Sequence, residues 1–223
     1  MKNIAAMTLI LLALAGSLSA NAIAINSTGS GLGSGTTDPN WTYSPPYGNS
    51  TLTGQAVVLS PGNYFSGWTT SDPNAKWIST CDAIATLSCI ESTPNNPVVV
   101  TYSTTFNLTG LDPSTAVLNI QYTGDDTLGA VRLNGVTEQD LNAGGLWGSL
   151  NSLTINSGFI AGLNTLSFDV TNTDNFYEGI LVDVTGTAAP ISSSGPPVPE
   201  PATFGLISAA FAGVIASRRF SKA

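Results

Sequence analysis

The chain has 223 residues, of which 42% are hydrophobic and only 9% are charged, and its formal net charge is −8. This length suits one folded domain with additional targeting segments, and the acidic balance excludes nucleic acid as a partner because phosphate backbones would be repelled. No histidine occurs in the sequence, which removes the commonest general base, the commonest metal ligand and every nucleophile that depends on a histidine. Two carboxylates would suffice for glycoside hydrolysis, but the domain is small and no carboxylate pair is marked by its spacing, so we expect a protein that is not an enzyme.

The N-terminus has the three regions of a secretory signal peptide. Lys2 supplies a positive charge, residues 4–18 form an apolar stretch, and Ser19-Ala20-Asn21-Ala22 ends in an Ala-x-Ala pattern. We predict that residues 1–22 are removed after Ala22, with Ala24 as the alternative cleavage position. A transmembrane anchor is the competing interpretation, but the apolar run is short and is followed by small residues. The chain is thus predicted to be exported across the inner membrane.

Residues 23–50 are rich in Gly, Ser, Thr, Pro and Asn. Such a segment offers little apolar surface to offset the entropy of ordering, so we predict a flexible leader. Trp41 and Tyr43 are the exceptions, and they could dock on the edge of the domain.

Residues 51–187 are predicted to form a single β domain, because short β-branched and aromatic segments alternate with turn residues. Residues 116–123 alternate between apolar and polar positions, and Asn134-Gly135 is a strong hairpin signal since both residues tolerate positive φ. No amphipathic helix is evident. The expected fold is an all-β, antiparallel two-sheet sandwich with strands at residues 55–59, 76–78, 98–108, 116–123, 130–133, 152–155, 165–170 and 180–184.

The order of strands and turns from Asp125-Asp126 through 131–135, 158–170 and 179–186 resembles the galactose-binding-like jelly roll. This fold occurs in carbohydrate-binding modules and in the sugar-binding domains of glycosidases, and its members often carry one structural calcium ion. The resemblance covers roughly residues 51–187. It bears mainly on the fold, and less on which ligand the domain binds. Fibronectin-like and immunoglobulin-like sandwiches are the structural alternatives.

Two further sets of residues are candidates for binding. Aromatic side chains in Gly- or Asn-rich stretches, with hydrogen-bonding groups nearby, predict a glycan site at one end of the sandwich, although aromatic side chains that merely plug the ends of the sandwich are the alternative. Carboxylates and amides in loops are the hard oxygen ligands that calcium prefers, although solvated turn residues are the simpler interpretation. The glycan candidates are Trp68, Trp147, Tyr177, Arg132 and Asp126, and the calcium candidates are Asp72, Asn74 and Glu178.

Cys81 and Cys89 are the only cysteines, and seven residues separate them. In a chain exported to an oxidising compartment they predict a disulfide that acts as a structural staple. Closing so short a loop would stabilise the domain by roughly 2 to 3 kcal/mol in the chain-entropy model.

The C-terminus begins with a Pro- and Ser-rich linker at residues 188–197 and continues with a Pro-rich break, an apolar run over 203–217 and two arginines. The run spans about 22 Å as a helix, so its flanking residues would be needed to cross a bilayer. Residues 198–223 resemble the PEP-CTERM sorting signal, which exosortases recognise and cut. The motif residues are Val198, Pro199, Glu200, Pro201 and Ala202, and the basic stop is Arg218 and Arg219.

This second resemblance implies an exosortase as partner, transient anchoring in the inner membrane through the C-terminal helix, and release to the cell surface or the extracellular matrix. Bacteria that use this system usually make exopolysaccharide, so extracellular polysaccharide is the expected ligand and biofilm the expected setting. The alternative is a passive structural envelope protein that its C-terminal helix anchors permanently. Removal of both ends would leave two cations, Lys76 and Arg132, against thirteen carboxylates, a formal charge near −11.

Overall fold

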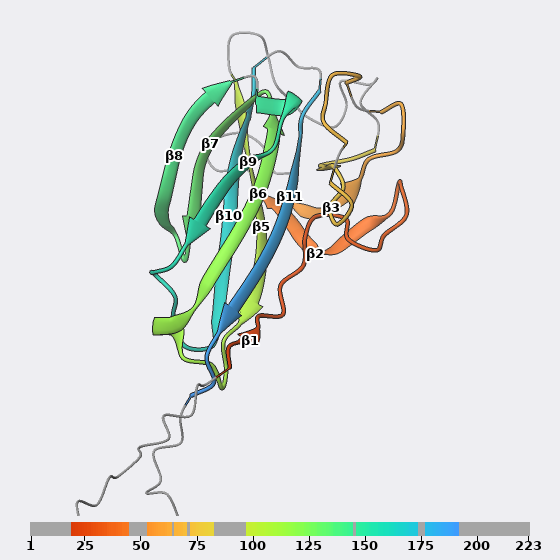
Figure 1. Cartoon of the computed structure of the whole chain (residues 1–223). Coiled ribbons are helices and arrows are strands. Elements are labelled where there is room, and N and C mark those ends of the chain that lie inside the picture. The colour runs from red at the N-terminus through yellow and green to blue at the C-terminus, as the bar shows by residue number, and fades with distance from the viewer. Residues whose placement is uncertain are drawn as a thin grey trace, which may run out of the picture. The chain divides into compact units, whose positions relative to one another are not determined.

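The computed structural model describes residues 19–44, 53–63, 65–70, 72–82, 97–144, 146–173 and 177–191. Strands dominate these residues, and two short 3-10 helices, η1 (Pro113–Thr115) and η2 (Leu146–Gly148), accompany them (Figure 1). The strands are β1 (Asn21–Ala22), β2 (Thr37–Ser44), β3 (Gly54–Val58), β4 (Ile78–Ser79), β5 (Val98–Asn107), β6 (Val117–Asp125), β7 (Thr127–Leu133), β8 (Val136–Gly144), β9 (Asn151–Ile155), β10 (Leu163–Asn172) and β11 (Gly179–Ala188).

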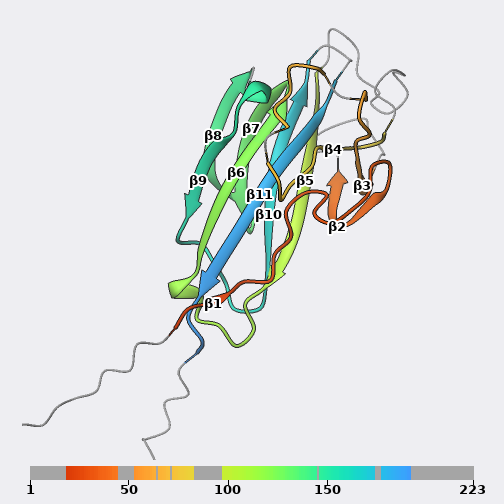
Figure 2. The ribbon, with the colours of Figure 1, turned by 45° about the vertical axis from the view of Figure 1, so that its right-hand side comes forward.

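All strand pairs are antiparallel, and hydrogen bonds connect the strands in the order β8-β7-β10-β5-β2-β3-β4-β11-β6-β9. In both views β9, β6 and β11 lie in front of β7, β10 and β5, with β2 and β3 to one side (Figures 1 and 2). The expected all-β, antiparallel fold is therefore confirmed. Its two layers are parts of one continuous sheet, because β2, β3 and β4 connect them.

The core lies between the two layers and follows from the alternation of the strands. Leu118, Ile120 and Tyr122 of β6 are buried, as are Ile180, Val182 and Val184 of β11, and all of them belong to one apolar cluster. Across the layers, the rings of Tyr122 and Phe168 are 6.0 Å apart. Period-two alternation places one face of each strand in this core and leaves the other face outside.

The predicted hairpin is confirmed. Asn134 and Gly135 form the turn between β7 and β8, with φ of 53° and 81°. The expected strands near 55–59, 98–108, 116–123, 152–155, 165–170 and 180–184 correspond to β3, β5, β6, β9, β10 and β11. The strand expected at 76–78 is shorter and later, since β4 contains only Ile78 and Ser79.

The flexible leader predicted for residues 23–50 is wrong for residues 23–44. Strand β2 pairs with β5, and Trp41 is fully buried with its Nε1 donating to the carbonyl of Asn26 at 3.0 Å. Upstream, the amide of Thr28 donates to the carbonyl of Val182 at 2.9 Å, and the amide of Gly29 donates to the buried carboxylate of Asp38 at 2.7 Å. The average composition of this segment predicted too little order, because one buried Trp and hydrogen bonds to the sheet are enough to order it.

The domain boundaries also differ from the predicted range of 51–187. Ile23 is buried in the core, and its amide donates to the carbonyl of Gly186 at 2.8 Å. At the other end Ala188 is buried in β11 and Pro190 forms a bridge with Leu111. Residues 188–191 of the predicted linker therefore belong to the domain, and the compact unit ends at Ile191.

Residues 1–18 of the predicted signal peptide, residues 192–197 of the predicted linker, and the C-terminal signal at 198–223 with its expected helix lie outside the described residues. Within the part of the chain that the structure describes, no helix has the length and apolar character needed to cross a membrane.

Candidate functional site

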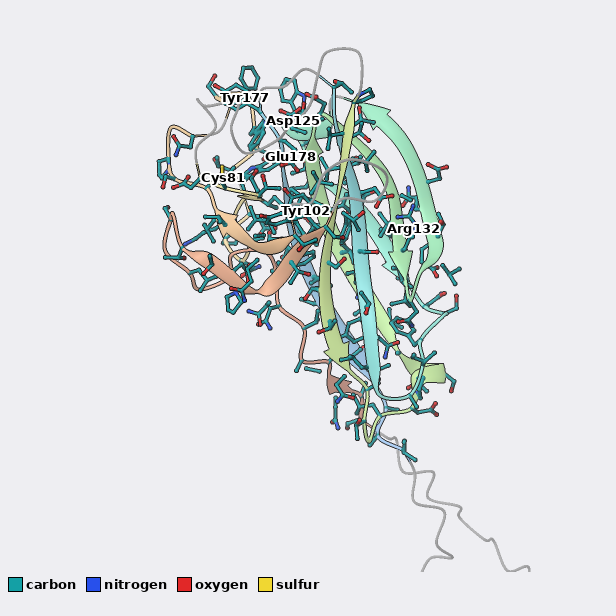
Figure 3. All side chains as sticks on the ribbon, turned by 180° about the vertical axis from the view of Figure 1, so that it is seen from behind. Cys81, Tyr102, Asp125, Arg132, Tyr177 and Glu178 are labelled. Atoms are coloured by element: carbon teal, nitrogen blue, oxygen red, sulfur yellow. The ribbon has the colours of Figure 1, made fainter. Side chains whose placement is uncertain are left out.

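Four connections meet at one end of the sandwich, which we call the loop end. They are the β3–β4 connection at 59–77, the β6–β7 turn at 126, the β8–β9 connection at 145–150 and the β10–β11 connection at 173–178. The β5–β6, β7–β8 and β9–β10 connections lie at the opposite end because the strands between them are antiparallel. Figure 3 labels Asp125, Tyr177 and Glu178, all of which lie toward the loop end.

Two tryptophans form the inner part of the loop end. The rings of Trp68 and Trp77 stack with centroids 3.9 Å apart, and each residue is only 4% exposed. Trp68 donates from Nε1 to the buried carboxylate of Asp125 at 2.7 Å, and Trp77 donates to the carbonyl of Thr69 at 2.8 Å. This stack is a second small core, and its ring faces are not available as a ligand platform.

Three other aromatic side chains surround that stack and reach the surface. Phe65 is 38% exposed, and its ring lies 5.2 Å from Trp147 and 5.8 Å from Tyr177. Tyr177 in turn contacts Trp68 edge-on at 6.1 Å, and both Trp147 and Tyr177 are partly exposed. We call Phe65, Trp147 and Tyr177 the aromatic patch. Three of the predicted glycan residues, Trp68, Trp147 and Tyr177, thus come together, although Trp68 is buried beneath the other two.

A half-open cavity of about 280 Å³ lies on the other side of the tryptophan stack. Its apolar part includes Trp77 and Leu181, and its polar part includes Asp72 and Lys76. The Lys76 ammonium group donates to the carbonyl of Leu32. Sequence reasoning missed this cavity because one wall comes from Ser34, in the segment predicted to be a flexible leader.

The remaining two glycan candidates do not join the aromatic patch. Arg132 lies six residues beyond the β6–β7 turn, about 20 Å along the strand direction, and pairs with Asp169 at 2.5 Å. Figure 3 shows Arg132 on the far side of the sandwich from Tyr177. Asp126 is at the loop end, where one of its oxygens accepts from the amide and hydroxyl of Thr173 at 2.7 and 2.8 Å.

Glu178 is 1% exposed and has a different environment from that of a calcium ligand. The Tyr102 hydroxyl lies 2.6 and 2.8 Å from its two carboxylate oxygens, and the Ser79 hydroxyl donates at 3.0 Å. Burial raises the pKa of Glu178 to about 7, and the negative charge of Asp126 adds to the rise, while the hydrogen bonds from Tyr102 and Ser79 act against it. Burial and the nearby Glu178 also raise the pKa of Tyr102 well above its usual range.

The predicted calcium ligands have separate partners. Asp72 accepts from the amides of Asn74 and Ala75 at 2.7 and 3.2 Å, which makes it the first residue of a turn. Asn74 is exposed and donates to Asp183 at 3.2 Å, whereas Glu178 is buried against Tyr102. Among the residues that the structure describes, no three carboxylate, histidine or cysteine side chains gather around one point. These donors do not fit one shared ion, and calcium binding stays a prediction without a site.

Cys81 follows β4 and is not a free thiol. Cys89 lies outside the described residues, so the Cys81–Cys89 pairing stays a prediction. Next to Cys81, the Asp82 carboxylate accepts hydrogen bonds from Ser60 and Asn63. Burial acts to raise the pKa of Asp82, but these hydrogen bonds outweigh it and lower the pKa below its usual value.

Comparison with curated proteins returns no match. Among solved structures, the chain is similar to a GH31 alpha-xylosidase from Xanthomonas citri, with 13% identity and a TM-score of 0.34. The likeness covers 68% of this chain and 16% of the enzyme, and it carries no argument about function. Residues 197–219 match the family described as the PEP-CTERM protein-sorting motif, and they include the predicted motif and both predicted arginines. The chain therefore carries a PEP-CTERM sorting motif, which implies an exported protein that an exosortase processes.

Proposed function

We propose that this protein is a non-catalytic component of the cell surface or extracellular matrix that binds extracellular polysaccharide at the loop end of its β domain. The sorting motif supports an extracellular destination. The binding proposal rests on the meeting of three aromatic rings from separate connections. Phe65 comes from the β3–β4 connection, Trp147 from the β8–β9 connection and Tyr177 from the residues just before β11. Partly exposed aromatic rings provide apolar faces on which the C–H surface of a sugar ring can lie.

The fold agrees with this proposal without deciding it. A jelly roll of the galactose-binding-like type is our interpretation of the two-layered sheet, and it rests on the order of strands and turns. A wholly passive envelope protein would need no exposed aromatic patch, whereas this chain places Phe65 38% exposed between two other rings.

The test is native affinity electrophoresis of the processed protein in gels that contain the extracellular polysaccharide of its own host. We expect the polysaccharide to retard the protein, and Trp147→Ala or Tyr177→Ala to weaken the retardation. Ile160→Ala is the matched control, because Ile160 is 52% exposed but lies in the connection at the opposite end. Migration that the polysaccharide does not change would refute binding and leave the passive structural role.

A further inference from the structure

The outer face of β11, β6 and β9 changes character along the strands. In β11, Ile180, Val182 and Val184 point into the core, so Leu181, Asp183 and Thr185 lie on the outer face. Leu181 is 1% exposed because it packs with Trp68 and Trp77, and Leu150, just before β9, packs against the same cluster. Near the loop end this face is therefore apolar and covered.

Beyond Leu181 the same face is polar and open. The strand register aligns Asp183, Gln121 and Ser152 in one row across the three strands. A second row on the same face, two residues away along each strand, consists of Thr185, Asn119 and Thr154. A hollow of about 280 Å³ lies over these six residues, and Figure 2 turns this face toward the viewer.

We propose that these two rows form the floor of a groove that holds a neutral polysaccharide. This inference rests on the proposed function, since it extends the same ligand from the aromatic patch onto the sheet. The three strands span about 10 Å, and the two rows are about 7 Å apart. Together these lengths define an area larger than one sugar ring. Amide and hydroxyl side chains both donate and accept hydrogen bonds, as sugar hydroxyls do.

The apolar cluster beneath the aromatic patch continues directly into the groove along two strands, β11 and β9. On β11, Leu181 beneath the tryptophan stack is followed two residues later by Asp183 in the first polar row. On the other side, Leu150 is followed in the same way by Ser152. Asp183 is held in place because Ser27 and Asn74 donate to its two oxygens at 2.7 and 3.2 Å.

Charge selects the class of polymer. Asp183 is the only charged residue among the six, and the mature domain carries a formal charge near −11, so an acidic polysaccharide would be repelled. The two cations of the mature domain do not offset this, since neither lines the groove. Arg132 pairs with Asp169, and Lys76 donates to the carbonyl of Leu32.

The experiment compares variants of the processed protein by affinity electrophoresis in gels with neutral polymers (dextran, xyloglucan, galactomannan) and acidic ones (alginate, polygalacturonate). We expect at least one neutral polymer to bind, and the double variant Gln121→Ala/Ser152→Ala to bind it about tenfold more weakly or worse. Thr105→Ala is the matched control, because Thr105 is exposed on β5 of the other layer. Melting temperatures of the variants close to that of the parent would show that folding is intact.

The outcomes separate the groove from the general proposal. If Trp147→Ala abolishes binding while Gln121→Ala/Ser152→Ala leaves it unchanged, the loop-end proposal stands and the groove is overturned. If only acidic polymers bind, and Gln121→Lys strengthens that binding, the neutral class is wrong. If neither the host polysaccharide nor any of these polymers retards the parent protein, both proposals are overturned.

Discussion

Glu178 provides the sharpest test of how the loop end is held together. It is buried immediately before β11 and accepts hydrogen bonds from Tyr102 of β5 and Ser79 of β4, so it ties the beginning of β11 to two other strands. Glu178→Gln keeps the size of the side chain and one acceptor oxygen, replaces the other oxygen with an amide that donates, and removes the charge. We expect the variant to match the parent protein below about pH 4.5 and to be more stable at pH 8.

The magnitude follows from the pKa. The folded state raises the pKa of Glu178 from 4.5 to about 7, so it binds the proton more tightly than the unfolded state does. The stability from this group is fully present below pH 4.5 and is lost as the pH rises to about 7. The shift corresponds to at most about 3 kcal/mol of unfolding free energy. Asp82, whose pKa is lowered, acts in the opposite direction and only near or below pH 4.

Urea unfolding followed by tryptophan fluorescence between pH 4.5 and 8 measures this difference. The free energy of unfolding of the parent should fall across that range by up to about 3 kcal/mol more than that of Glu178→Gln. Asp140→Asn is the control for the loss of one negative charge, because Asp140 is an exposed carboxylate on β8. A Glu178→Gln variant that is less stable than the parent at pH 8 would refute the reasoning, since it would show that the site favours the charged form.

Two further predictions concern the N-terminal segment. Trp41→Ala should lower the free energy of unfolding by about 3 to 5 kcal/mol in the same urea assay, because Trp41 is fully buried against Phe168; an effect below about 1 kcal/mol would mean that the segment is not part of the core. Intact mass of the exported protein should show Ile23 as the first residue, because cleavage after Ala24 would remove a buried side chain and the hydrogen bond to Gly186; a mature chain that starts at Ile25 would contradict this.

Local signals in the sequence were sufficient for most of the fold. Asn134-Gly135 predicted its hairpin because two positive φ values in succession suit few other pairs. The alternation of residues 116–123 predicted the core face of β6 because side chains alternate across a strand. The sorting motif needed no structure, since its order of prolines, apolar run and arginines is contiguous in the chain.

The candidate site depended on contacts between distant residues. Trp68, Trp147 and Tyr177 could be predicted to meet because all three belong to connections at one end, but the burial of Trp68 against Trp77 could not. Glu178 looked like a loop carboxylate because nothing nearby in the sequence shows that Tyr102, 76 residues away, lies against it.

By itself, then, the sequence determined the sorting motif, the all-β class and the acidic, histidine-free character of the chain, because each depends on composition or on neighbouring residues. Only the tertiary structure decided that residues 23–44 belong to the domain, that the aromatic side chains divide into a buried stack and an exposed patch, and that six polar side chains line up across three strands. The physical reason is that burial and strand register are set by partners far away in the chain. Ile23 is buried beside Gly186, and Asp183 lies opposite Gln121, although no local pattern connects either pair.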